Sequence, residues 1–233
     1  MAIYAISDLH LSFGATDKPM NIFGENWNNY EEKIRKSWTE NITDEDHVIL
    51  SGDFSWATYL EDSKADFEFL NSLPGKKYIL KGNHDYWWTT VKKMNDFLDT
   101  NGFKNIYFIY NNAYDLGTYT LTGTRYWGYE EEDVDNEKIY NREVLRAKIG
   151  LDAACVLAPE KPIIFTTHYP PDDRIIVGLE EYNIKVWIYG HLHTKHEENM
   201  VNIPNITTYL TSCDYLDFNV KKIDWNLAKN VEK

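Results

Sequence analysis

The sequence predicts an α/β fold in which two β-sheets carry helices on their outer faces. Short apolar runs alternate with helical patterns through residues 1–100, which is typical of βαβ units and a largely parallel sheet. A second set of apolar runs begins after residue 105 and is divided by one long helical segment. The chain of 233 residues is 43% hydrophobic, so it contains enough apolar material for a sizeable core.

The first half of the chain alternates strands and helices in a regular way. Strands are expected at residues 3–6, 47–50 and 76–80, and helices at residues 29–41, 60–72 and 89–99. In the first of these helices, Tyr30, Ile34 and Trp38 recur every four positions, which indicates one buried helix face. We therefore expect neighbouring parallel strands joined by helical crossovers.

The second half of the chain departs from this regular alternation. Strands are expected at residues 106–110, 118–124, 162–168 and 186–191, with a long helix at residues 136–158 that ends before Pro159. The tail, from residue 197 to residue 223, has the pattern of short antiparallel strands separated by turns.

The charge limits the classes of binding partner, and the cysteine content indicates the redox compartment. The chain has 24 basic and 37 acidic residues, a net charge of −13, which disfavours a nucleic acid polymer but permits a small anionic substrate at a local cation. Cys155 and Cys213 lie far apart, so we expect two buried thiols in a reducing compartment. Neither a signal peptide nor a membrane-spanning run is recognisable, so a cytoplasmic location without membrane association is expected; the oligomeric state stays open.

Polar side chains gather where five of the predicted strands end. The residues concerned are Asp8, His10, Asp53, Asn83, His84, Asp85, His168, His191 and His193. Ligands of open α/β sheets bind beyond the carboxyl ends of the strands, so these groups are expected to meet in one crevice. A single histidine at a strand end is more often a hydrogen-bonded structural residue, but the whole set predicts a metal site.

The spacing within these blocks also favours metal binding. In D-x-H and H-x-H the two side chains are two positions apart, and in extended backbone they point to the same face. Glycine precedes Asp53, Asn83 and His191, where it allows a sharp turn or a close approach of the backbone. Imidazole and carboxylate donors without thiolate suit manganese, iron, zinc or cobalt better than magnesium or calcium.

Taken in order, the blocks D-x-H, GD, GNHD, a single histidine after a strand, and GH-x-H resemble the calcineurin-like metallophosphoesterases. More narrowly, the chain resembles a bacterial group of predicted phosphohydrolases in that superfamily. The resemblance extends from Asp8 to His193. It implies a four-layer α/β sandwich of two mixed β-sheets flanked by helices, formed by residues 1–233 as a single domain.

The same resemblance implies a centre of two divalent transition metal ions. One ion would be held by Asp8, His10, Asp53 and His193, and the other by Asp53, Asn83, His168 and His191. His84 would lie near the leaving group as a general acid. Two cations about 4 Å apart can clamp the attacking and leaving oxygens, with a bridging hydroxide as the nucleophile. With two carboxylates and a hydroxide, the local charge is about +1, so an acidic chain can still bind phosphate.

The partner of His84 is where the chain departs from part of the family. Beside two cations, His84 would need a carboxylate to remain protonated. The protein-phosphatase branch supplies an aspartate within GDxxDRG, whereas this chain reads GDFSW and has Trp56 in that place. This argues against a protein Ser/Thr phosphatase. Asp85 is the nearest candidate, either as the catalytic partner of His84 or as a cap of the turn into residues 89–99.

Other residues near these blocks are candidates for substrate binding. Trp56, Trp87 and Trp88 either fill the core or line the pocket, where an aromatic wall would suit a nucleoside or aryl leaving group. Arg125 either clamps a phosphate oxygen, pairs with Glu130–Glu132, or is a surface charge. Tyr169, which precedes two prolines, is expected in a rigid loop at the rim of the crevice.

These features predict a dinuclear metal-dependent phosphoesterase that hydrolyses a small phosphomonoester or phosphodiester. Its expected partner is a small phosphorylated molecule, nucleotide-like if a tryptophan lines the pocket. Two alternatives stay open. A nuclease at the same site would need a basic groove, which the sequence does not show. A non-catalytic metal-binding scaffold of the same fold would be free to lose His84 or a ligand, whereas this chain retains them.

Overall fold

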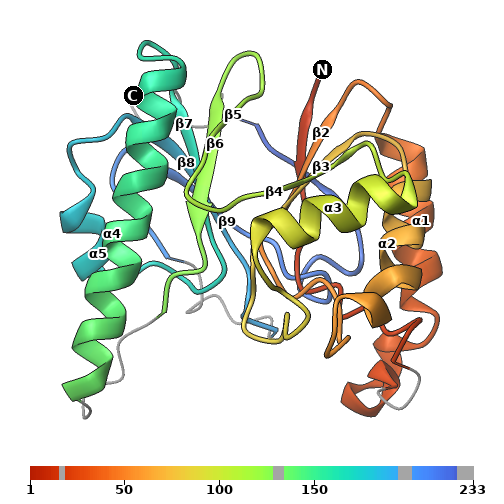
Figure 1. Ribbon diagram of the computed structural model, residues 1–233. Coiled ribbons are helices and arrows are strands. Elements are labelled where there is room, and N and C mark those ends of the chain that lie inside the picture. Colours follow the sequence, from red (N-terminus) through yellow and green to blue (C-terminus); the bar gives the residue numbers. More distant parts are fainter. Residues whose placement is uncertain (16–18, 128–133, 194–200, 225–233) are drawn as a thin grey trace.

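The computed structural model describes residues 1–15, 19–127, 134–193 and 201–224. Within these ranges, ten strands form two five-stranded sheets, which lie side by side in Figure 1. The first sheet has the order β10-β1-β2-β3-β4 and the second has the order β5-β6-β7-β8-β9. Both are mixed, because β10 pairs antiparallel with β1 and β5 pairs antiparallel with β6, while the other pairs are parallel.

The first half of the chain builds most of the first sheet and confirms the predicted alternation. Its elements are β1 (Ile3–Ala5), α1 (Tyr30–Asn41), β2 (His47–Leu50), α2 (Lys64–Ser72), β3 (Lys76–Ile79), α3 (Val91–Asn101) and β4 (Ile106–Phe108). Short 3₁₀ turns at Met20–Phe23, Glu25–Trp27 and Glu61–Ser63 fill the connections. Each helix joins two parallel strands, as crossover connections require.

The second half builds the other sheet and adds β10 to the edge of the first. Its elements are β5 (Tyr114–Asp115), β6 (Thr120–Thr124), α4 (Val134–Leu157), β7 (Ile163–Thr167), α5 (Asp173–Gly178), β8 (Ile184–Tyr189), β9 (Thr207–Leu210) and β10 (Lys221–Lys222). The prediction of an antiparallel tail is wrong for β9, which runs parallel to β8. The connection from β8 to β9 is long enough to return the chain to the same end of the sheet.

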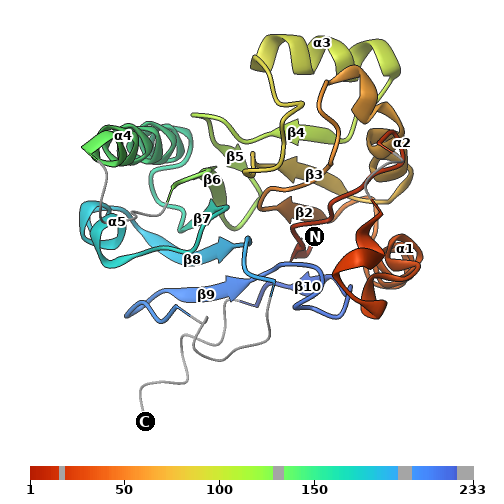
Figure 2. The same cartoon turned by 90° about the horizontal axis from the view of Figure 1, so that it is seen from below.

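Apolar side chains on opposite faces of the strands divide the interior into three cores. Ile49 of β2 packs with Ile164 of β7 and Ile188 of β8 in a core between the two sheets. Val48 and Leu50 instead face a core shared with α1, α2 and α3. A third core lies between the second sheet and α4 and α5. The alternation confirms a four-layer α/β sandwich, which Figure 2 shows with helices outside both sheets.

The structure also bears on the expectations about the cysteines and about membrane-spanning segments. Cys213 is buried, as expected, but Cys155 is exposed, which corrects the prediction of two buried thiols. Cys155 lies in the last turns of α4, on the helix face turned away from the sheet. Among the helices in the described ranges, none combines the length and the apolar character that a bilayer crossing requires.

Lys77 of β3 is fully buried, and its ammonium group donates a hydrogen bond to the carbonyl of Leu73. Burial lowers the pKa of Lys77 to about 8, which the nearby carboxylate of Asp44 partly opposes. Between pH 8 and pH 10 the unfolded chain therefore binds a proton at this lysine that the native protein lacks. The free energy of unfolding should rise with pH in this window, by at most about 1.4 kcal/mol per pH unit.

Lys77→Met should abolish this rise and should make the protein more stable at pH 7, because an uncharged side chain fills the same space. Urea unfolding at several pH values measures both effects. Lys76→Met is a matched control on the same strand, at a partly exposed position, and should leave the pH dependence unchanged. Parallel stability profiles for the wild type and Lys77→Met would contradict the prediction.

Candidate metal centre

The predicted ligands lie just beyond the carboxyl ends of five parallel strands. Asp8 and His10 follow β1, Asp53 follows β2, Asn83 follows β3, His168 follows β7, and His191 and His193 follow β8. Three of these strands belong to the first sheet and two to the second. The site therefore lies where the two sheets meet, and neither sheet supplies it alone.

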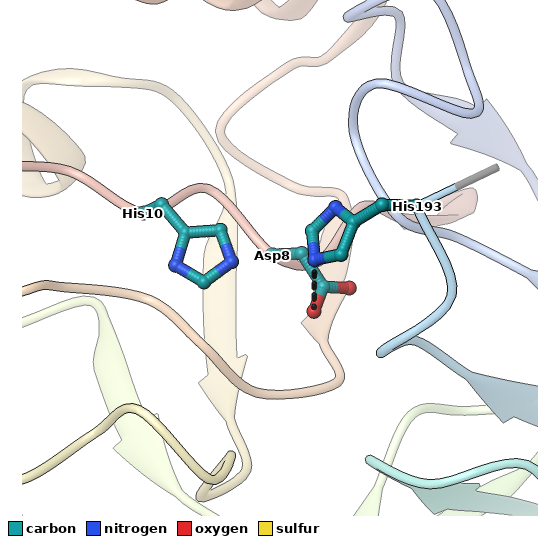
Figure 3. Close-up of side chains that lie close together, drawn as sticks. All are labelled: Asp8, His10 and His193. Atoms are coloured by element: carbon teal, nitrogen blue, oxygen red, sulfur yellow. Dashed lines mark ion pairs between the residues drawn. The ribbon is translucent and has the colours of Figure 1, made fainter. Parts of the chain in front are cut away.

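Asp8, His10 and His193 form one group, in which the ligand atoms all lie within 4.8 Å of one another. Figure 3 shows the two imidazoles turned toward the carboxylate of Asp8, whose Oδ1 is 4.0 Å from Nε2 of His193. Asp8 and His10 are buried, while His193 is partly exposed. This mixture of one carboxylate and two imidazoles suits a divalent transition metal ion.

Asp8 also belongs to a second group, formed by Asp8, Asp53 and His168, whose ligand atoms lie within 4.8 Å of one another. Oδ2 of Asp53 is 3.8 Å from Nε2 of His10 and 3.5 Å from Nε2 of His168. This buried oxygen accepts no hydrogen bond from the described residues. A carboxylate oxygen that faces an imidazole of each group has the position expected of a shared ligand, and an orphaned buried oxygen fits a cation.

The contacts of Asn83 supply an independent test of metal fit. Nδ1 of His168 is 2.9 Å from the carbonyl oxygen of Ser51 and must donate to it, which leaves a lone pair on Nε2. That Nε2 is 2.6 Å from Oδ1 of Asn83, and Nδ1 of His191 is 3.1 Å from the same oxygen. An imidazole lone pair and an amide oxygen this close repel each other unless both face one cation, so the pair fits two ligands of the same ion.

The protonation states of these groups also fit metal binding. Burial lowers the pKa of His10 and of His168 well below the usual value, and it lowers the pKa of His191 to about 4, with the charge of His193 adding to the effect. These imidazoles are therefore neutral and able to ligate. Burial raises the pKa of Asp8 to about 6 and that of Asp53 well above the usual value. A bound cation would stabilise both carboxylates as anions.

Several ligands are held by left-handed backbone. Asp8, His10, Asp53 and His191 have φ angles of 55°, 46°, 51° and 71°. The expectation that D-x-H and H-x-H reach the metals from extended backbone is therefore wrong, although Asp8 and His10 do converge. Non-glycine residues in this region are uncommon and cluster at functional sites, because the surrounding structure must compensate the strain.

Two glycines allow the ligand loops to touch. A Cβ atom on Gly82 would overlap Oδ1 and the backbone nitrogen of Asp53. A Cβ atom on Gly190 would overlap Oδ2 of Asp8. Each glycine precedes one ligand in sequence and packs against another ligand from a different strand. The glycine pattern in the sequence thus reflects close packing between loops.

Asp85 has a role that neither prediction anticipated. Its Oδ2 accepts hydrogen bonds from the backbone of Asp53 (2.9 Å) and Gly82 (2.7 Å), and its Oδ1 accepts from the backbone of Phe54 (2.9 Å) and the indole of Trp87 (3.0 Å). The fully buried carboxylate therefore joins the β2 and β3 loops.

These hydrogen bonds give Asp85 a structural role in the loops, because its oxygens are directed at N–H groups; its catalytic role stays a prediction. The structure corrects the capping alternative. The N-cap of α3 is Thr90, whose side chain accepts from the backbone of Lys93.

The three candidate tryptophans lie in different environments. Trp56 is at the site, where its ring stacks on the imidazole of His10 at 4.8 Å and lies 4.5 Å from the ring of His84. Trp87 is only 2% exposed and packs against Phe54, which favours the core-filling alternative for this residue. Trp88 is partly buried and lines a large cavity beside the metal loops.

His84, Tyr169 and Arg125 surround the ligands. The backbone nitrogen of His84 donates to Oδ1 of Asp53 at 2.8 Å, and its ring is 5.6 Å from that of His10. The ring of Tyr169 is 4.2 Å from that of His191, as expected of a residue at the crevice. Arg125 lies on the same cavity as Trp88, with its guanidinium 4.8 Å from the ring of Trp127. Its predicted partners at Glu130–Glu132 lie outside the described residues.

Asp214 is a functional candidate that the sequence did not reveal. It lies beyond β9, and its Oδ1 is 3.1 Å from Nδ1 of His193. Burial opposes the charge of His193, but the hydrogen bond to Asp214 raises the pKa of that imidazole. A carboxylate that holds the far nitrogen of a ligand histidine fixes its orientation. The only sequence signal was an aspartate in the turn SCD, which resembles an ordinary turn residue.

Asp214→Asn should weaken metal binding or activity by roughly 10- to 100-fold, because the His193 imidazole loses the acceptor that orients it. Isothermal titration calorimetry with the metal ion measures the loss of metal affinity. Asp99→Asn, an exposed position on α3, removes the same charge far from the ligands and serves as the control. Equal affinities for the two variants would show that Asp214 has no part in orienting the ligand.

Comparison with known proteins agrees with this geometry. A family model described as calcineurin-like phosphoesterase matches residues 1–195. No curated protein matches the chain. Among solved structures, the chain is similar to the protein of unknown function AQ665 from Aquifex aeolicus, with 19% identity, 95% coverage of both chains and a TM-score of 0.52. It is also similar to TT1561 of Thermus thermophilus, with 14% identity, coverage of 96% and 98%, and a TM-score of 0.52. These two structures support the fold alone.

Proposed function

The chain belongs to the calcineurin-like phosphoesterase family, and from that premise we propose that it is a dinuclear metal-dependent phosphoesterase acting on a small phosphomonoester or phosphodiester. The observation that carries the proposal is the convergence of imidazole and carboxylate donors from four strand ends into two groups that share Asp8. The lone pairs of His168 and Asn83, opposed at 2.6 Å, support a cation at this position.

Seven side chains would hold the two ions. These are Asp8, His10, Asp53, Asn83, His168, His191 and His193. When bound, the cations would supply Lewis acidity toward the phosphate and an activated water as the nucleophile. The choice among manganese, iron, zinc and cobalt is left to experiment, because the donor set suits each of them.

The chain's own groups position the reaction. The backbone of His84 holds Oδ1 of Asp53, so that Oδ2 of the same carboxylate faces His10 and His168. We place the His84 side chain on the leaving-group side of the site as a catalytic residue, since its ring lies beside His10 and Trp56 at the edge of the ligand set. Trp56 would shield this edge from water and contact the leaving group.

The proposed substrate is a small molecule in the cytoplasm. The net charge of −13 would repel a long polyanion, while the metal ions would attract a single phosphate group. Nucleic acids are therefore tested as the alternative substrates rather than as the expected ones. Neither oligomerisation nor a protein partner enters the proposal.

Metal analysis and a substrate screen test the proposal together. The protein is stripped with chelator and reloaded separately with manganese, iron, zinc or cobalt. We expect two ions per chain and turnover of p-nitrophenyl phosphate or bis-p-nitrophenyl phosphate, with Asp53→Asn as the blank. Full metal content without turnover of any phosphomonoester, cyclic nucleotide or diester would favour the metal-binding scaffold. Turnover of single-stranded DNA or RNA alone would favour the nuclease.

A further inference from the structure

A cavity of about 970 Å³ lies beside the metal loops and is strongly cationic. It is bounded by the residues that follow β3 and β4, by the end of β6, by the start of α3 and by one face of α4, elements that Figure 1 labels. Its charged lining residues are Lys81, Arg125, Arg142, Arg146 and Glu143. Four cations against one carboxylate leave a surplus of three positive charges among the described lining residues, in a chain whose net charge is −13.

Two of the residues that line the cavity are close to metal ligands along the backbone. Lys81 directly precedes Gly82 and Asn83. The carbonyl of Arg125 accepts a hydrogen bond from the backbone nitrogen of His168 at 3.1 Å. Two residues that supply cations to the cavity are therefore close to metal ligands, one in the sequence and one through a backbone hydrogen bond, which places the cavity beside the candidate metal centre.

Glu143 organises the arginines of α4. It is fully buried; its Oε1 is 2.6 Å from Nη1 of Arg146 and 3.6 Å from Nε of Arg142, and its Oε2 accepts from Thr124 at 3.0 Å. One carboxylate thus holds two guanidinium groups in place. Each guanidinium has five N–H donors, so both retain donors that can bind another anion.

The remaining walls are partly aromatic. Trp88 and Tyr110 line the cavity, and Trp88 packs edge-on against Phe108. An aromatic wall beside fixed guanidinium groups is suited to a molecule that combines a flat or apolar body with an anionic end.

From these observations we infer that the cavity binds a second phosphate group, carried by the leaving group of the substrate. The inference rests on the proposed phosphoesterase function and specifies its substrate class as organic bisphosphates with a compact body, such as nucleoside bisphosphates. The scissile phosphate lies at the metal ligands, while the second phosphate is held by Arg125, Arg142 and Arg146.

Matched substrate pairs test the inference. We compare kcat/KM for adenosine 3′,5′-bisphosphate with that for adenosine 5′-monophosphate, and for fructose 1,6-bisphosphate with that for fructose 6-phosphate, identifying the products in each case. The second phosphate should raise kcat/KM by about tenfold or more, the gain expected of one or two charge-assisted hydrogen bonds. Equal rates within both pairs, in an enzyme that hydrolyses p-nitrophenyl phosphate, would overturn this inference and leave the proposed function intact.

Two charge variants on α4 locate the effect. Arg142→Gln removes a charge that lines the cavity, and should lower the bisphosphate preference by roughly five- to tenfold. Lys148→Gln removes an equal charge that pairs with Glu181 on the surface, and should leave the preference unchanged. Equal losses of the bisphosphate preference in the two variants would show a general effect of charge. An unchanged bisphosphate preference in Arg142→Gln would exclude the assigned subsite.

Binding to the metal-free protein separates the failure of this inference from the failure of the proposed function. Adenosine 5′-monophosphate should bind more tightly than adenosine in calorimetry without metals, because its phosphate can occupy the cavity, whose cations belong to the chain. This difference should shrink in Arg142→Gln and survive in Lys148→Gln. If no phosphomonoester, cyclic nucleotide or diester is hydrolysed, the proposed function fails, and equal binding of adenosine 5′-monophosphate and adenosine would then reject the cavity assignment as well.

Discussion

Asp53→Asn should reduce kcat/KM for p-nitrophenyl phosphate by more than about 100-fold, since loss of a residue that merely orients a metal ligand already costs roughly 10- to 100-fold. Oδ2 of Asp53 lies between Nε2 of His10, at 3.8 Å, and Nε2 of His168, at 3.5 Å. An amide at this position removes the negative charge that would be shared between the two ions. Metal content should fall together with activity.

Stability measurements distinguish this loss from misfolding. Burial raises the pKa of Asp53 well above its usual value, with the carboxylates of Asp85 and Asp8 adding to the effect. The ionised side chain therefore destabilises the metal-free native protein at pH values above the raised pKa. Asp53→Asn should be at least as stable as the wild type without metal, and should lose most of the metal-dependent rise in Tm. Retention of that rise, with Asp99→Asn as the charge control, would contradict the assignment.

Gly82→Ala should also abolish activity, by a different route. The added methyl group would overlap Oδ1 and the backbone nitrogen of Asp53, so the β2 and β3 loops must separate. Overpacking of this kind typically costs about 1–3 kcal/mol of stability. Because Asn83 directly follows Gly82, metal affinity should decline with the displacement of the loop. Urea unfolding and metal titration measure the two consequences.

Gly178→Ala is the matched control. It is the last residue of α5, and the nearest atom to its added Cβ is 3.8 Å away, an ordinary contact. We expect this variant to keep wild-type activity, and its stability should stay within about 0.5 kcal/mol of the wild type. Normal metal affinity in Gly82→Ala would show that the loop contact at Gly82 is dispensable for the site.

The sequence was sufficient for those features that arise from local pattern. Strand periodicity located β2 and β3, and the polar blocks after them identified Asp53 and Asn83 as ligand candidates. The strand ends meet because parallel strands place their carboxyl ends at one edge, which requires no knowledge of side-chain packing. The glycine before each of these ligands was also informative, although the sequence did not reveal which residue of another loop it contacts.

Features that depend on distant parts of the chain could not be predicted. Asp85 looked like a catalytic partner or a helix cap, because its hydrogen bonds to the backbone of residues 53–55 span about thirty positions. Asp214 looked like a turn residue until the parallel return of β9 placed it beside His193. The cationic cavity likewise requires α4 to pack beside the loop that follows β3.

The order of the ligands along the chain has a consequence for biosynthesis. The end of β1 is tied to the segment after β9, since Ser7 donates to the carbonyl of Thr211 at 2.7 Å and Cys213 donates to that of Ser7 at 2.9 Å. Asp8 thus leaves the ribosome about two hundred residues before the segment that supports it. A nascent chain grows N-terminus first, so it exposes an incomplete ligand set until β9 and the segment after it are made. Metal loading is therefore expected only after that segment has docked on the end of β1.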